Sequence, residues 1–353
     1  VAVYCSMVYP GKLAEALKGL DFEDEGAVKA ALVRSFIALD DSLLTEEAEK
    51  ILARNKGGSD SNGFDDDGSS SSGRADSAYV GCTAVVALVK RGKLYVANAG
   101  DSRCIVSRAC GVLQEMSEDH TPHHPAERER IVKAGHAVSR EGRVDGNINI
   151  SRTIGDHEYK SPALPHAERA VSCVPDVRVL DVAAAGVDYA VLACDGVWDV
   201  MGNQNLLNFI RKRLFPKSVA DASDDSGVFS LSEAYAKSAF SKWPGDSADT
   251  LGGLLGLVSN QVVQRCIRAK GVGDGMDNVS FMMVLFKESS FGKLLLPGIG
   301  AGLTEERKAL IEKKWSELSS TFGCDNSSNK KRPEPQCACD ESSGKGEGLE
   351  GAA

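Results

Sequence analysis

Residues 189–199 read Tyr-Ala-Val-Leu-Ala-Cys-Asp-Gly-Val-Trp-Asp, and the fold of the chain is most readily inferred from this stretch. An apolar run with the length of a buried strand ends at Asp195, a glycine follows, and a second carboxylate stands at Asp199. An unpaired charge at the edge of a hydrophobic core is costly to desolvate. The stretch therefore predicts a buried strand whose end carries a cation, a network of donors or a metal ion.

A second apolar run, residues 279–286, directly follows Asp277 and a Gly-rich turn. Two strands with Asp at their ends indicate carboxylates that converge on one hard cation, Mg²⁺ or Mn²⁺. Asp101, in a Gly-Asp-Ser turn between two strand-like segments, is a further candidate. Alone, Asp101 is better explained by bonds to its own turn, and the alternative for Asp199 is an N-cap of a helix. Taken together with Asp195 and Asp277, the spacing favours a metal site.

Composition limits the class of protein. The 353 residues are 42% hydrophobic and 26% charged, as in ordinary globular domains. No apolar run approaches the ~20 residues of a membrane helix, and no signal-peptide pattern opens the chain. The net charge of −9 argues against a general nucleic-acid surface. Ten cysteines without a C-x-x-C pair suggest reduced thiols. We expect an intracellular monomer, in the cytoplasm or nucleus, that binds neither membrane nor nucleic acid.

The order of the segments predicts helices first, then a meander of strands, then mixed elements. Residues 57–78 are rich in Gly, Ser and Asp, which predicts a disordered acidic insertion. Beyond residue 290 we expect a linker with a helix over 291–322 and a disordered tail over 323–353. Helices are predicted within 11–55, 127–134, 205–214 and 257–269, and strands at 83–89, 94–99, 103–107, 147–154, 177–182, 189–193 and 279–286.

Several motifs occur in one order: Ala-Asn-Ala-Gly-Asp-Ser-Arg at 97–103, Asp-His-Thr-Pro at 119–122, Ser-Arg-Thr-Ile-Gly-Asp at 151–156, Cys-Asp-Gly-Val-Trp-Asp at 194–199 and Asp-Asn at 277–278. In this order they resemble the motifs of the metal-dependent (PPM, type 2C) protein serine/threonine phosphatases. The likeness spans residues 1–286. The acidic Ser-rich insertion and residues 155–160 look most like the gamma-type member.

The resemblance implies an α+β fold, a β-sandwich of two antiparallel sheets with helices on both outer faces, over a domain of residues 1–290. It implies a two-metal centre at one end of the sandwich, where a metal-bridging water attacks phosphoserine or phosphothreonine in protein substrates. Asp195 and Asp277 match ligands of one core Mg²⁺ or Mn²⁺ ion. Asp101 and Asp199, with Asp195, match a weaker third site.

One part of the family pattern does not occur in residues 1–353. The Asp-Gly-His-Gly-Gly motif would supply the bridging Asp and a general acid, and an upstream Arg would bind phosphate. Residues 1–5 resemble the helix that follows this motif, so we expect a domain that is incomplete at its N-terminus and inactive alone. No catalytic or substrate-binding residue is assigned, Arg152 included. The alternative is a non-catalytic pseudophosphatase that binds phosphoproteins, and the residues upstream of Val1 would distinguish the two.

Overall fold

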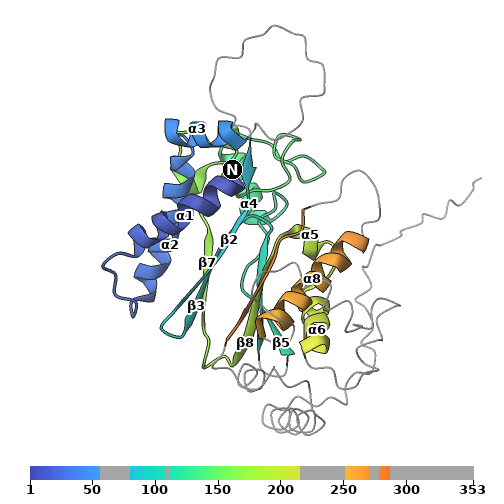
Figure 1. Cartoon of the computed structure of the whole chain (residues 1–353). Coiled ribbons are helices and arrows are strands. Elements are labelled where there is room, and N and C mark those ends of the chain that lie inside the picture. Colours follow the sequence, from blue (N-terminus) through green and yellow to red (C-terminus); the bar gives the residue numbers. More distant parts are fainter. Residues whose placement is uncertain (56–79, 109–110, 215–250, 270–277, 287–353) are drawn as a thin grey trace, which may run out of the picture.

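The computed structural model describes residues 1–55, 80–108, 111–214, 251–269 and 278–286, and it shows two antiparallel sheets packed face to face (Figure 1). One sheet has the strand order β2-β3-β7, and the other has the order β5-β4-β8-β9. A short pair, β1 with β6, lies apart from both. The strands are β1 Gly81–Cys82, β2 Ala84–Lys90, β3 Lys93–Ala99, β4 Arg103–Arg108, β5 Val112–Glu115, β6 Ile154–Gly155, β7 Asp176–Asp181, β8 Val187–Ala193 and β9 Phe281–Leu285.

The central strands are apolar on both faces, which is why helices cover the sandwich on both sides. Along β3, Leu94 and Val96 enter the core between the sheets, whereas Tyr95 and Ala97 point to the helices outside. Successive side chains of a strand alternate between faces, so both sets need a partner layer. β8 behaves in the same way, with Ala190 between the sheets and outward-facing residues in the opposite helical cluster.

One helical layer covers each outer face (Figure 1). Helices α1 Ala2–Leu17, α2 Glu25–Ser42 and α3 Glu46–Asn55 pack on the β2-β3-β7 side. Helices α5 Asp195–Trp198, α6 Asn203–Leu214 and α8 Leu251–Ala269 pack on the β8 side. Helix α4 Pro125–Lys133 and the 3₁₀ turns η4 His157–Tyr159 and η5 His166–Glu168 lie in the long connection from β5 to β7. The expected β-sandwich flanked by helices on both faces is confirmed.

The element boundaries correct several expectations. The strand predicted at 147–154 is wrong over most of its length, because only Ile154–Gly155 joins a strand pair. Before it the backbone makes isolated bridges, Val144 with Ile148 and Arg152 with Ser172, that bind loops together. Strands β1 and β5 were not predicted, being only two and four residues long. Within the described residues no helix has the length and apolar content needed to cross a bilayer.

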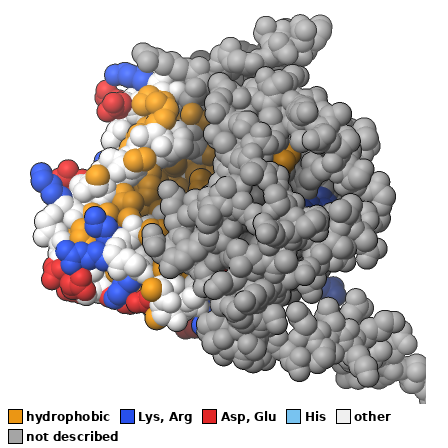
Figure 2. Space-filling view, turned by 60° about the horizontal axis from the view of Figure 1, so that its bottom comes forward, with side chains coloured by type: hydrophobic (Ala, Val, Ile, Leu, Met, Phe, Trp, Pro, Cys, Tyr) orange, Lys and Arg blue, Asp and Glu red, His pale blue; other side chains and the backbone are white. Residues whose placement is uncertain are grey.

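Some expectations concern residues outside the described ranges. They are the acidic insertion at 57–78, the linker and helix at 291–322, and the tail at 323–353. On the face seen in Figure 2, acidic and basic side chains are interspersed along one edge, and apolar side chains lie inward from them. Neither sign of charge dominates the described part of that view.

A buried ion pair fastens α2 to the segment around β6. The Asp40 side chain is fully buried, and its Oδ1 accepts hydrogen bonds from Lys160 Nζ at 2.7 Å and from the Gly155 amide at 2.8 Å. Burial raises the pKa of Asp40, but His157 and Lys160 outweigh it and lower the pKa to about 2. Asp40 is therefore charged, and the contact spans 120 positions of sequence.

Removing the Asp40 carboxylate should leave the buried Lys160 ammonium without its anion. We expect Asp40→Ala to lower the free energy of unfolding by about 3–5 kcal/mol. The matched control is Asp41→Ala, because the neighbouring carboxylate is half exposed and pairs with His166 near the surface, so a loss of no more than about 1 kcal/mol is expected. Urea denaturation at neutral pH measures the free energy of unfolding of both variants. Equal losses of stability would show that the buried pair contributes no more than the exposed one.

Candidate metal centre

The pairing of β4 with β8 brings Asp101 and Asp195 to the same end of one sheet. Arg103 pairs with Ala193, and the two carboxylates lie two positions beyond these residues in opposite chain directions. Burial, and next to it the charge of Asp195, raises the pKa of Asp101 to about 6. Asp119 and Asp199 contribute in the same direction. The structure thus places two of the other three predicted ligands, Asp195 and Asp199, within electrostatic range of Asp101.

The turn that carries Asp101 is shaped by steric contact. Gly100 adopts φ +118°, and a Cβ at this position would lie 2.4 Å from Thr83 Cγ2. Glycine is therefore required both by the backbone conformation and by the close approach of the neighbouring chain. On the other side of the turn, the hydroxyls of Thr83 and Ser102 share a hydrogen bond of 2.9 Å. Thr83 consequently fixes the turn on both sides of Asp101.

His120 holds the same turn through backbone and side chain. Its amide donates to the Gly100 carbonyl, and its Nδ1 accepts from the Gly100 amide at 3.1 Å. Because Nδ1 is an acceptor, the ring proton lies on Nε2, which donates to Asp176 Oδ2 at 3.2 Å. Asn98 Nδ2 also donates to the Gly100 carbonyl. The Asp-His motif at 119–120 is thus a support for the acidic turn.

Arg103 forms a two-point ion pair with Asp119 beside the turn. Its Nε and one terminal nitrogen donate to the two oxygens of Asp119 at 2.6 and 2.7 Å, and its other terminal nitrogen donates to Asn203 Oδ1 at 3.1 Å. A bidentate pair of this kind fixes both side chains. Arg103 therefore neutralises Asp119, and its guanidinium also interacts electrostatically with Asp101.

Asp195 begins the single-turn helix α5, and the chain after Asp277 lies against it. Cys194 Sγ accepts from the Ser280 amide and donates to the Asn278 carbonyl, both at 3.1 Å. A Cβ on Gly196 would lie 2.4 Å from the Asn278 oxygen. Asn278 thus sits at the turn of Asp195, while Asp277 itself lies outside the described residues. Asp199 closes α5 at its C-terminal end and does not cap a helix N-terminus.

These donors fit a hard divalent cation, since carboxylate oxygens are the ligands that Mg²⁺ and Mn²⁺ prefer. Crowded like charges at a partly buried strand end also favour a bound cation over an empty site. Within the described residues, no three His, Cys, Asp or Glu side chains already converge as a metal cluster. The carboxylates of Asp101, Asp195 and Asp199 therefore gather at one end of the β4–β8 pair, with a chemistry that suits a divalent cation but without forming a converged set of ligands.

The sequence did not single out Glu127, which belongs to a network of ion pairs that leads to the turn of Asp101. Its side chain is 4% exposed and accepts from Arg152 at 2.7 Å and from Arg130 at 2.8 Å. Arg152 also binds Asp176 Oδ1 at 2.7 Å, and Asp176 accepts from His120. Arg152 is thereby built into a structural network. Nothing in the local pattern shows that Glu127, rather than Glu129, is buried in this network, because Arg152 lies 25 positions along the chain.

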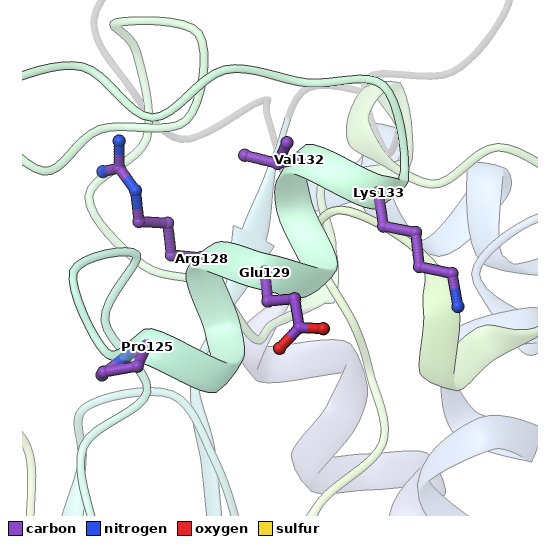
Figure 3. A pocket seen from close by; sticks show the side chains of 5 residues that line it. All are labelled: Pro125, Arg128, Glu129, Val132 and Lys133. Atoms are coloured by element: carbon purple, nitrogen blue, oxygen red, sulfur yellow. The ribbon is translucent and has the colours of Figure 1, made fainter.

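A shallow hollow over α4 is lined by Pro125, Arg128, Glu129, Val132 and Lys133 (Figure 3). The figure shows these side chains spreading away from the helix in different directions. A ligand site needs polar groups that converge. The hollow has no such arrangement, and the acidic strand ends remain the candidate site.

Glu127 should make the stability of the protein depend on pH in the acid range. Burial raises its pKa, but Arg152 and Arg130 outweigh this and lower it to about 2. The unfolded chain has a higher pKa, so the stabilisation is complete above about pH 4.5 and is lost as the pH falls toward 2. Between about pH 5 and pH 2.5 we expect the wild type to lose about 2 kcal/mol more than Glu127→Gln.

Urea unfolding across this pH range measures the difference. The matched control is Glu129→Gln, which replaces an exposed residue of the same helix and should follow the wild-type curve. A Glu127→Gln curve parallel to the wild type would show that the buried network does not hold the carboxylate ionised.

Comparison with known proteins gives the family. The model of the family described as Protein phosphatase 2C matches residues 5–229. The "Probable protein phosphatase 2C 11" of Oryza sativa subsp. japonica is 37% identical over 236 residues, which are 65% of this chain and 55% of that protein. Protein phosphatase 1G of Homo sapiens is 34% identical over 252 residues, 70% of this chain and 38% of that protein.

A solved structure described as a C. elegans sex determining protein superimposes with a TM-score of 0.51 at 19% identity, covering 79% of this chain and 52% of that one. At this identity the likeness shows the fold alone. The chain spans 55% and 38% of the length of the rice and human relatives. Because the family model covers more than half of the chain, the chain belongs to the protein phosphatase 2C family.

Proposed function

We propose that the protein containing this chain hydrolyses phosphoserine and phosphothreonine in protein substrates with the help of Mg²⁺ or Mn²⁺. The observation that carries the proposal is the crowding of Asp101 and Asp195 at the shared end of β4 and β8. Membership of the family supports the reaction class. In this proposal Asp195 and Asp277 hold one of two core ions, and Asp101 and Asp199, with Asp195, hold a weaker third ion.

The residues of the chain supply orientation in this scheme. When bound, the ions activate water and neutralise the charge of the phosphate. Asp195 projects from the end of a strand buried on both faces, and the turn of Asp101 is held by His120 and Thr83. Both carboxylates are therefore placed by rigid elements before any ligand arrives, which limits the ordering that binding requires.

We further propose that residues 1–353 are an incomplete catalytic unit. The Asp-Gly-His-Gly-Gly motif does not occur in them, and the described carboxylates form only one wall of the proposed centre. The partners would be phosphoproteins. An intracellular location, in the cytoplasm or the nucleus, is part of the proposal, and similarity to human protein phosphatase 1G supports a gamma-type member.

Replacing Asp195 should weaken metal binding without damaging the fold. For Asp195→Asn in the full-length protein we expect Mn²⁺ affinity to fall at least about tenfold, because one anionic ligand is lost. The metal-free variant should be no less stable than the wild type, since repulsion with Asp101 is relieved. Calorimetric titration and thermal melts measure the two effects.

The control is Asp181→Asn. Asp181 pairs with Lys93, at the end of β3 that is opposite to the acidic turn. Its Mn²⁺ affinity should equal that of the wild type. Unchanged affinity in Asp195→Asn would remove Asp195 from the metal site.

Residues 1–353 alone should show negligible turnover, because no general acid is identified in them. The measurement is Mn²⁺-dependent release of phosphate from a phosphothreonine peptide, made in parallel on this fragment and on the full-length protein. Release by the fragment would contradict the proposed incompleteness. If the full-length protein binds the phosphopeptide but releases no phosphate, the non-catalytic binding module replaces the enzyme as the better interpretation.

A further inference from the structure

Two cysteines that are distant in sequence meet beside the first helical layer. Cys5 lies on α1 and Cys82 on β1, 77 positions apart, and their sulfur atoms are 3.9 Å from each other. Cys5 is 9% exposed and Cys82 is half-buried, so the pair lies just below the surface. A disulfide needs the sulfurs at about 2.0 Å, which requires them to move about 2 Å closer. Side-chain rotation can supply such a movement where one thiol is only partly packed.

We propose that Cys5 and Cys82 are a modification site that closes to a reversible disulfide when the protein meets a hydroperoxide. The Cys5 thiolate attacks one oxygen of hydrogen peroxide, the O–O bond breaks, and Cys5 becomes a sulfenic acid while hydroxide leaves and takes up a proton as water. Cys82 then attacks the Cys5 sulfur, the S–O bond breaks, and a second water leaves with the Cys82 proton. Two thiols lose two electrons, and one peroxide is reduced to two waters.

The environments of the two thiols support this division of roles. The hydrogen bond from Cys82 lowers the pKa of Cys5 despite its burial, whereas the same bond, together with burial, raises the pKa of Cys82. The thiolate is the nucleophilic form, so Cys5 is the one that reacts first. By contrast, burial raises the pKa of Cys104 to about 12. Cys104 therefore serves as an unreactive comparison within the same chain.

Closing the disulfide would join α1 covalently to β1 and hold the segment that leads into the acidic turn. Thr83, the residue after Cys82, contacts Gly100 and bonds Ser102. The link also closes a long loop, which restricts the unfolded chain more than the folded one. We therefore expect the oxidised protein to melt at a higher temperature than the reduced protein, and this expectation does not depend on the phosphatase reaction.

Peptide mapping of the full-length protein tests the proposal directly. The native protein is treated with a small excess of hydrogen peroxide, remaining thiols are blocked with N-ethylmaleimide, and the digest is analysed without reduction. We expect a peptide in which Cys5 is joined to Cys82, and its loss after treatment with dithiothreitol. Cys104→Ser should give the same linked peptide. Cys82→Ser should give none and should accumulate sulfenic acid at Cys5, trapped with dimedone.

Thermal melts of oxidised and reduced protein provide a second measurement. The midpoint should rise on oxidation in the wild type and in Cys104→Ser, and should not rise in Cys82→Ser. Oxidation of Cys5 and Cys82 as separate sulfinic acids would overturn the proposal, as would linkage of either cysteine to another residue. The wild-type map decides the matter even where a variant folds poorly.

Discussion

The structure depends on the register between β4 and β8. These strands pair Arg103 with Ala193, and β8 is apolar toward both neighbouring layers. A slip of one residue would turn every side chain of β8 to the opposite face. The two hydrophobic layers therefore hold the register in place, and the register in turn sets Asp101 against Asp195. Apolar packing is what keeps two mutually repelling carboxylates together.

A chain of polar contacts stabilises the acidic turn from behind. Glu127 forms an ion pair with Arg152, and Arg152 forms another with Asp176. Asp176 accepts a hydrogen bond from His120, whose Nδ1 accepts one from the Gly100 amide. Buried charges are tolerated only where each has a partner, and this network meets that condition. The pKa of Asp176 is held well below its usual range by the His120 hydrogen bond and by Arg152. Asp176, which supports the turn through His120, thus remains ionised.

The sequence could predict what local patterns encode. Strands β2, β3, β4 and β8 follow from apolar runs bounded by turns, and Asp101 and Asp195 follow from their places at strand ends. Asp40 and Glu127 could not be predicted, since the partner Lys160 lies 120 positions from Asp40 and the partner Arg152 lies 25 positions from Glu127. The strand expected at 147–154 was wrong because most of that segment bonds to loops. Asp277 stays a prediction, and so does the organisation beyond residue 290.

Gly100 carries a consequence for how this chain can vary over evolution. Gly100 cannot contact a ligand through a side chain, but Thr83 leaves no room for a Cβ at this position. Its backbone conformation also disfavours residues other than glycine. A change at this position would displace Asp101 while leaving both hydrophobic layers intact. A protein with such a substitution would keep both hydrophobic layers and lose the position of Asp101 beside Asp195. The placement of Asp101 is therefore more easily lost by substitution at this glycine than the hydrophobic layers are.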